Sequence, residues 1–326
     1  MQRPDTVKII YLLTILTFFI SFFSKVYTKN EKSTSVPPKV KISIIEDLAG
    51  KIKENYVYPE KGEKMAKALK HTFAQGSFDR VETFPDFADS LTNYLRTIVN
   101  DKHLRIKTSK VIESDIMFPV LEGQQKHGIT ATKILEGNIG YLAFNSFPRL
   151  NKANRKAISA SMEKLEDTKA IIMDLRNNGG GDPATVQLYC SYFFDENPIL
   201  LNSLYLRPEN ITRDYYTLKT VEGRKMPHKP LYILTSDYTF SGAEEFCYNM
   251  QTRERALVIG ETTGGGAHPV NAFKMDNRLT AIIPVGRAIN PITGTNWEGT
   301  GIQPNISCDA TEALQNAINL INDASD

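Results

Sequence analysis

Apolar residues recur at intervals of three and four positions through the first part of the chain beyond residue 40. This spacing places them on one face of an α-helix and therefore predicts amphipathic helices. The clearest example is the series Phe84, Phe87, Leu91, Leu95 and Ile98. Patterns of this kind cover residues 42–56, 60–74 and 84–100. We therefore predict a small helical bundle over residues 41–102.

The pattern changes beyond about residue 103, where short apolar runs alternate with further helical stretches. Runs that predict strands cover residues 104–108, 140–144, 170–174, 230–234, 256–259 and 279–284. Stretches that predict helices cover residues 153–166, 183–194, 241–253 and 311–324. Strands that alternate with helices of this length favour parallel pairing in an α/β fold. The expected second domain is thus an α/β core over residues 103–326.

The first residues have a different character from the rest of the chain. Arg3 and Lys8 precede an uninterrupted apolar stretch over residues 9–23. A basic segment followed by an apolar one predicts a secretory signal, and bulky residues after the stretch leave an uncleaved membrane anchor as the alternative. We assign residues 1–29 to this signal or anchor and residues 30–40 to a polar linker. Both alternatives predict an extracytoplasmic protein, with membrane attachment through residues 9–23 in the second.

Charge and cysteine content narrow the function further. The 326 residues include 39 basic and 37 acidic side chains, for a net charge of +2. This balance argues against nucleic acid as a partner, since such binding needs a concentrated basic face. The cysteines, Cys190, Cys247 and Cys308, have no metal-binding or redox spacing, and no two histidines have the spacing of zinc ligands. We therefore expect no metal and no organic cofactor.

One polar turn has the residues of a nucleophile site. A buried strand is predicted to end at Leu234, and a helix is predicted to begin at Ser241, which Gly242 follows. A hydroxyl at a helix N-terminus lies among free N–H groups that favour negative charge, and Gly242 offers a further N–H for an oxyanion. The alternative is that Ser241 only caps the helix, with Glu244 completing a capping box.

A second turn is rich in glycine. The predicted strand ending at Asp174 is followed by Gly179-Gly180-Gly181, and a helix is predicted from Pro183. Successive glycines at this place allow backbone amides to converge on an anion, as in a phosphate loop or an oxyanion hole. Neither nucleotide-binding signature is present in the sequence, which disfavours the phosphate loop. A tight turn without further function is the simplest alternative.

Taken in order, the segments at residues 174–181, 239–244, 258–266 and 296–305 resemble those of the tail-specific (C-terminal-processing) protease family. The Ser-Lys branch of that family has a lysine where this chain reads Gly264-Gly265-Gly266, so the sequence is more similar to the branch of interphotoreceptor-retinoid-binding-protein modules and the tricorn core. The resemblance implies a crotonase/ClpP-like β-superhelix core. Too few residues separate His103 from Gly140 for the PDZ domain of many members.

The resemblance also implies a set of catalytic residues. His103 matches the histidine of the branch and would act as the base for Ser241, while Glu298 matches a glutamate that would orient the histidine. His268 is a competing candidate for the base. Backbone amides of Gly180 and Gly242 would hold the oxyanion. The expected function is hydrolysis of a peptide or protein substrate through an acyl-enzyme; the alternative is a non-catalytic binding module for an apolar small molecule or peptide.

Overall fold

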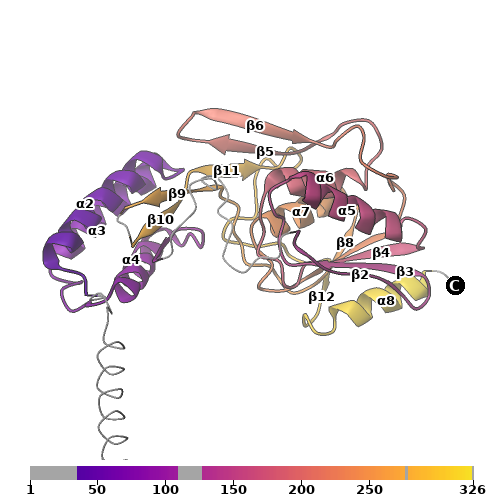
Figure 1. Ribbon diagram of the computed structural model, residues 1–326, viewed down its shortest axis with the longest axis horizontal. Helices are drawn as coiled ribbons and strands as arrows, with labels where there is room; N and C mark the ends of the chain where they lie inside the picture. The colour runs from indigo at the N-terminus through magenta and orange to yellow at the C-terminus, as the bar shows by residue number, and fades with distance from the viewer. Residues whose placement is uncertain (1–34, 109–126, 276–277, 325–326) are drawn as a thin grey trace, which may run out of the picture.

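The computed structural model describes residues 35–108, 127–275 and 278–324. Two lobes are visible in Figure 1: the N-terminal helices lie on one side, and a larger lobe built on a twisted sheet lies on the other. The predicted α/β core behind a helical N-terminal region is confirmed. No helix among the described residues is long and apolar enough to cross a membrane. The predicted signal or anchor lies outside those residues.

The smaller lobe contains the three predicted helices, α2 (Pro38–Asn55), α3 (Pro59–Ala74) and α4 (Phe84–Val99). The side chain of Thr83 caps α4 by accepting a hydrogen bond from the Asp86 N–H at 3.2 Å. At the other end, Asn100 adopts a left-handed conformation with φ of 48° and ends the helix. This turn directs the following residues, Asp101 to His103, away from the bundle and towards the larger lobe.

A strand pair from late in the sequence completes the smaller lobe. β1 (Arg105–Lys107) pairs antiparallel with β10 (Thr280–Pro284), which pairs with β9 (Val270–Lys274). Leu279, Ala281 and Ile283 are buried in the same apolar cluster as the three helices. The chain therefore returns from the core to the bundle, and residues 270–284 pack with the N-terminal helices although we assigned them to the second domain by sequence order.

The larger lobe is organised around a six-stranded sheet whose strands follow the order β12-β8-β7-β4-β3-β2. Its pairs are parallel except for β2 with β3. The strands are β2 (Ile129–Leu135), β3 (Ile139–Phe144), β4 (Ala170–Asp174), β7 (Leu231–Thr235), β8 (Leu257–Gly260) and β12 (Ile306–Ser307). Parallel strands buried on both faces have nearly continuous apolar sequences, which explains why β4 and β7 were recognisable as strands.

Helices cover both faces of this sheet (Figure 1). Alternate strand residues such as Ile171 and Ile233 join an apolar cluster with α5 (Lys152–Leu165), α6 (Pro183–Ser191) and α7 (Gly242–Gln251). Their neighbours Ile172 and Leu234 pack instead against α8 (Ala313–Asp323) on the opposite face. This division follows from the two-residue period of a strand.

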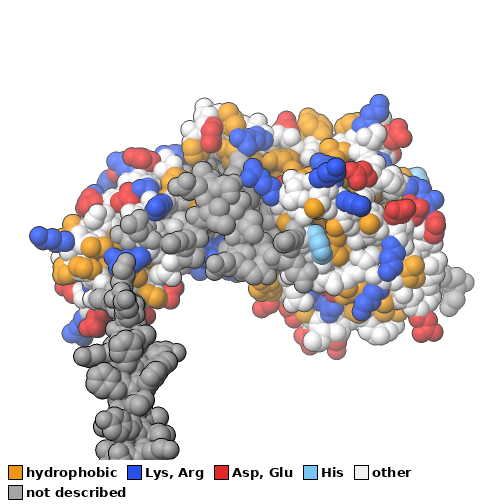
Figure 2. All heavy atoms as spheres, viewed as in Figure 1, with side chains coloured by type: hydrophobic (Ala, Val, Ile, Leu, Met, Phe, Trp, Pro, Cys, Tyr) orange, Lys and Arg blue, Asp and Glu red, His pale blue; other side chains and the backbone are white. Residues whose placement is uncertain are grey.

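A third sheet lies at the edge of the larger lobe and was not predicted from the sequence. It contains β5 (Leu200–Leu206), β6 (Ile211–Tyr216) and β11 (Gly286–Ile289) in the order β11-β5-β6. On the face shown in Figure 2, acidic and basic side chains are interspersed over both lobes, and neither sign gathers into a patch.

Candidate active site

The turn at Ser241 is held in an unusual backbone conformation. The chain leaves β7 and enters α7 with Ser241 at φ of 57° and ψ of −120°, a conformation that L-residues rarely adopt. The Ser241 N–H donates to the Glu244 carboxylate at 2.8 Å, and the predicted capping box is present. Strain of this kind at a strand-to-helix turn presents a serine hydroxyl at the surface of the fold, as in enzymes whose nucleophile lies at such a turn.

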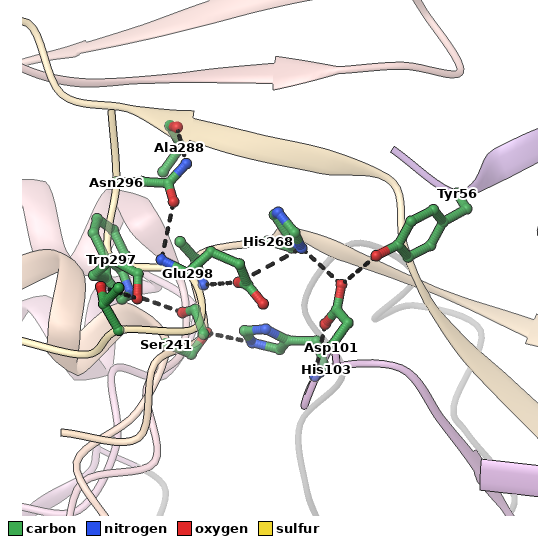
Figure 3. Close-up of polar contacts among 12 residues, drawn as sticks. Tyr56, Asp101, His103, Ser241, His268, Ala288, Asn296, Trp297 and Glu298 are labelled. Atoms are coloured by element: carbon green, nitrogen blue, oxygen red, sulfur yellow. Dashed lines mark hydrogen bonds and ion pairs between the residues drawn. The ribbon is translucent and has the colours of Figure 1, made fainter. Parts of the chain in front are cut away.

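His103 lies directly opposite this hydroxyl (Figure 3). The distance between His103 Nε2 and Ser241 Oγ is 3.0 Å, although 138 residues separate them in the sequence. The ring is buried and packs against Phe240 with the ring centroids 4.6 Å apart. Its Nδ1 atom has no hydrogen-bond partner among the described residues. For Nε2 to accept the serine proton, the proton of the neutral ring must reside on Nδ1.

Burial determines the charge of this histidine. Desolvation lowers the pKa of His103 to about 3, and the nearby Asp101 carboxylate only partly opposes that effect. The ring is therefore neutral near pH 7, the state in which a histidine can remove a proton. Asp101 also fixes the backbone at this point, since its Oδ1 accepts the His103 N–H at 3.0 Å.

The second histidine has a different environment. His268 Nδ1 lies 2.7 Å from Asp101 Oδ2 and 3.5 Å from Glu298 Oε2 (Figure 3). The phenol of Tyr56 also donates to Asp101 Oδ2, at 3.0 Å. Burial lowers the pKa of His268, but the hydrogen bond and charge of Asp101 outweigh burial and raise it overall. The structure therefore gives His268 carboxylate partners and brings His103, not His268, to the serine.

Glu298 does not contact the ring that it was expected to orient. Its Oε2 accepts the Ala267 N–H at 2.6 Å and lies beside His268, while His103 Nδ1 stays without a partner in the described part of the chain. Burial, followed by the charge of Asp101, raises the pKa of Glu298 to about 7. Of the expected Ser-His-Glu contacts, the one between Ser241 and His103 is present, and none joins His103 to Glu298 among the described residues. The carboxylate that contacts the His103 backbone is that of Asp101.

Asp101, His268 and Glu298 are also the side chains in this region that could hold a metal ion. Their potential ligand atoms lie within 4.8 Å of one another. Asp101 Oδ2, however, already accepts hydrogen bonds from both Tyr56 and His268. The hydrogen bonds from His268 and Tyr56 to Asp101, with Glu298 beside His268, account for the cluster without a metal. We therefore interpret it as a hydrogen-bonded charge cluster.

The glycine-rich turn lies against Ser241, but the glycine amide available at the cavity is not the expected one of Gly180. The Gly180 N–H donates to the Asn178 side chain at 2.9 Å, so it is not available for an oxyanion. Gly181 and Gly242 line the cavity beside Ser241, and a Cβ on Gly242 would lie 2.9 Å from the Gly181 nitrogen. The two neighbouring amides at the cavity are therefore those of Gly181 and Gly242. Gly180 instead stabilises the turn through its hydrogen bond to Asn178.

A buried carboxylate joins the serine turn to the second glycine run. Glu244 accepts hydrogen bonds from the N–H groups of Ser241, Gly265 and Gly266 and from the Thr263 hydroxyl. The capping-box pattern identified this glutamate in the sequence, but not the distant loop that it binds. Asp101 carried a weaker signal, since it lies two residues before His103. Tyr56 carried none, because only the fold brings the end of α2 to this site.

Comparison with known proteins identifies the family of this chain. The profile described as Peptidase family S41 matches residues 138–308, which is just over half of the chain, and the N-terminal domain of peptidase S41 in eukaryotic IRBP matches residues 38–136. Carboxyl-terminal-processing peptidase 1 of Arabidopsis thaliana is 25% identical, over 51% of this chain and 33% of its own length. The protease CtpA of Bacillus subtilis is 25% identical, over 55% and 36%. The chain thus spans about a third of the length of these relatives.

Solved structures with the same fold extend the match over most of the chain. A lipoprotein from Streptococcus agalactiae is 16% identical, covers 86% of this chain and 96% of its own, and has a TM-score of 0.57. The tricorn protease is 10% identical, over 88% and 37%, with a TM-score of 0.56. The photosystem II D1 C-terminal processing protease is 14% identical, over 83% and 93%, with a TM-score of 0.52. By sequence profile and by fold, this chain belongs to peptidase family S41.

Proposed function

We propose that the protein is a serine peptidase that hydrolyses peptide bonds through an acyl-enzyme, with Ser241 as nucleophile and His103 as base. The observation that carries this proposal is the 3.0 Å contact between Ser241 Oγ and His103 Nε2 at a strained helix N-terminus. A hydroxyl becomes an effective nucleophile when a neutral base lies within hydrogen-bond reach. Peptides and proteins are the proposed substrates, and an extracytoplasmic location follows from the predicted signal or anchor.

In the proposed reaction, Ser241 Oγ attacks the peptide carbonyl carbon while its proton passes to His103 Nε2. The amides of Gly181 and Gly242 donate to the oxyanion that forms, because they are the neighbouring N–H groups at the cavity. Collapse of this intermediate breaks the C–N bond, and His103 gives its proton to the leaving amine. Water, from which His103 removes a proton, then hydrolyses the serine ester and frees Ser241.

Asp101 has a positioning role in this scheme. It holds the His103 backbone at 3.0 Å, and its charge favours the imidazolium that forms during each proton transfer. Glu298, which we expected to orient His103 directly, is proposed to act at one remove, through His268 and Asp101. His268 in this scheme keeps Asp101 ionised, since its hydrogen bond and charge help to lower the pKa of that carboxyl despite burial.

Labelling with a fluorophosphonate tests the proposal, because this probe reacts with activated serines. The purified protein should gain one adduct by intact-mass analysis, and peptide mapping should find it on Ser241. Ser241→Ala should gain none, whereas Ser159→Ala, a change at a half-buried position of α5, should label at the wild-type rate. An unlabelled wild type would instead favour the non-catalytic binding module, and a label that persists in Ser241→Ala would place the reactive group elsewhere.

A further inference from the structure

A buried acidic side chain lies one helical turn beyond the serine. Glu245 follows Ser241 by four residues on α7, an axial distance of about 6 Å. Both residues line the same cavity, whose empty volume, including the part open to solvent, is about 370 Å³. Glu245 is only 5% exposed. None of the steps proposed above uses this carboxyl group.

The remaining walls of the cavity are largely apolar and come from several elements. Leu204 of β5, Val270 of β9 and Ala288 of β11 lie on its sides together with Trp297, whose indole is fixed by a 2.8 Å hydrogen bond to the Gly266 carbonyl. The described residues that line the cavity include no lysine or arginine. The cavity therefore combines apolar sides and two histidines, His103 and His268, with one carboxyl group, and its described lining offers no lysine or arginine to pair with it.

The described groups around the Glu245 carboxyl group include an amide but no cation. Asn202 of β5 is fully buried, and its side-chain amide is a polar neighbour of the Glu245 carboxyl group. Burial raises the pKa of Glu245 to about 8; the Asn202 side chain opposes this effect, and the charge of Asp182 adds to it. The other ionisable groups whose charge couples to Glu245 are Cys190 and Tyr215, neither of which is a cation. The group thus lacks a positive partner that would favour its charged form.

A substrate side chain can supply that partner. Methylene groups fit the apolar walls, and an ammonium group at the end of the chain would meet the carboxylate in a site shielded from water. The short span along α7 suits the compact ammonium of lysine more than the wider guanidinium fork of arginine. We propose, on the basis of the serine peptidase function above, that this cavity is a subsite for a lysine side chain of the substrate, with Glu245 at its base.

The test measures binding, so it does not depend on turnover. Trp297 is the single tryptophan of the sequence and lines the cavity, so its fluorescence reports occupancy. The probes are Nα-acetyl-lysine methylamide and Nα-acetyl-norleucine methylamide, which differ only in the ammonium group. The wild-type protein should bind the lysine probe at least about tenfold more tightly. Glu245→Gln should remove this preference, and Glu196→Gln, at an exposed position, should retain it.

Glu245→Asp provides a second variant that keeps the charge and shortens its reach, and it should weaken lysine binding without abolishing the preference. Equal binding of the two probes to the wild-type protein would overturn the subsite, whether or not any variant folds. So would a lysine preference that survives Glu245→Gln. Fluorophosphonate labelling is followed in the same samples. Failure to label Ser241 counts against the peptidase alone, and loss of lysine selectivity in a labelling-competent protein counts against the subsite alone.

Discussion

The substitution Gly266→Ala adds one methyl group, which should push the His103 ring away from Ser241. A Cβ at residue 266 would lie 2.2 Å from Phe240 Cζ and 2.7 Å from His103 Cε1. Carbon atoms in contact are normally about 3.5–4.0 Å apart, so the His103 ring must move by about 0.8 Å or more. The two rings pack together, so displacing Phe240 leaves His103 no nearby space.

A shift of that size would lengthen the present 3.0 Å contact between Nε2 and Oγ beyond hydrogen-bond range. Misplacing a reacting group by about 1 Å can cost about 100-fold in rate. We therefore expect Gly266→Ala to lower the fluorophosphonate labelling rate of Ser241 about 100-fold. The overpacked methyl should also reduce the free energy of unfolding by about 1–3 kcal/mol.

Gly179→Ala is the matched control, because a Cβ there meets only the Tyr238 ring at ordinary distances of 3.7 and 4.0 Å. The assay is the rate of adduct formation by intact-mass analysis, with circular dichroism and urea unfolding of each variant in parallel. If Gly266→Ala labels within about twofold of wild type and keeps its stability, the reasoning from ring displacement is refuted. An equal loss in both variants would also refute it, because the effect would then be general to the glycine turns.

Three further predictions follow from the buried charges. Asp101→Asn removes the negative charge beside His268 and should reduce stability by about 3–5 kcal/mol in urea unfolding. Exposed Asp89→Asn is the neutral control, and a loss below about 1 kcal/mol in Asp101→Asn would contradict the prediction. Because burial lowers the pKa of His103 to about 3, its contribution to stability is complete above pH 6.5 and is lost as pH falls towards 3. The unfolding free energy should therefore fall by up to about 1.4 kcal/mol per pH unit in that window, and His103→Gln should remove this slope. Burial raises the pKa of Glu245 to about 8, so the binding preference for the lysine probe should increase as pH rises through that value; a flat ratio between pH 6 and 9 would exclude an ionising carboxyl at the base of the cavity.

Local patterns in the sequence were sufficient for the parts of the fold that depend on neighbouring residues. The amphipathic series from Phe84 to Ile98 defined α4, and the continuous apolar runs defined β4 and β7, because helix and strand periods are properties of short segments. The short polar strand β6 and the third sheet gave no such pattern. The residues of β6 and β11 become strands only by pairing with β5, which lies between them.

Residue type and spacing were enough to identify the turns that could carry chemistry: a serine at a helix N-terminus and glycines after a buried strand. The side chains that meet at these turns became known from the folded chain, since the partners are far apart in the sequence. Ser241 and His103 are separated by 138 residues, and Asp101 and His268 by 167. The same holds for the oxyanion turn, where the Asn178 side chain occupies the Gly180 amide and leaves Gly181 at the cavity. Contacts at such separations depend on how the two lobes pack against each other and on which hydrogen bonds each side chain makes. Residue type and spacing along the chain do not specify either.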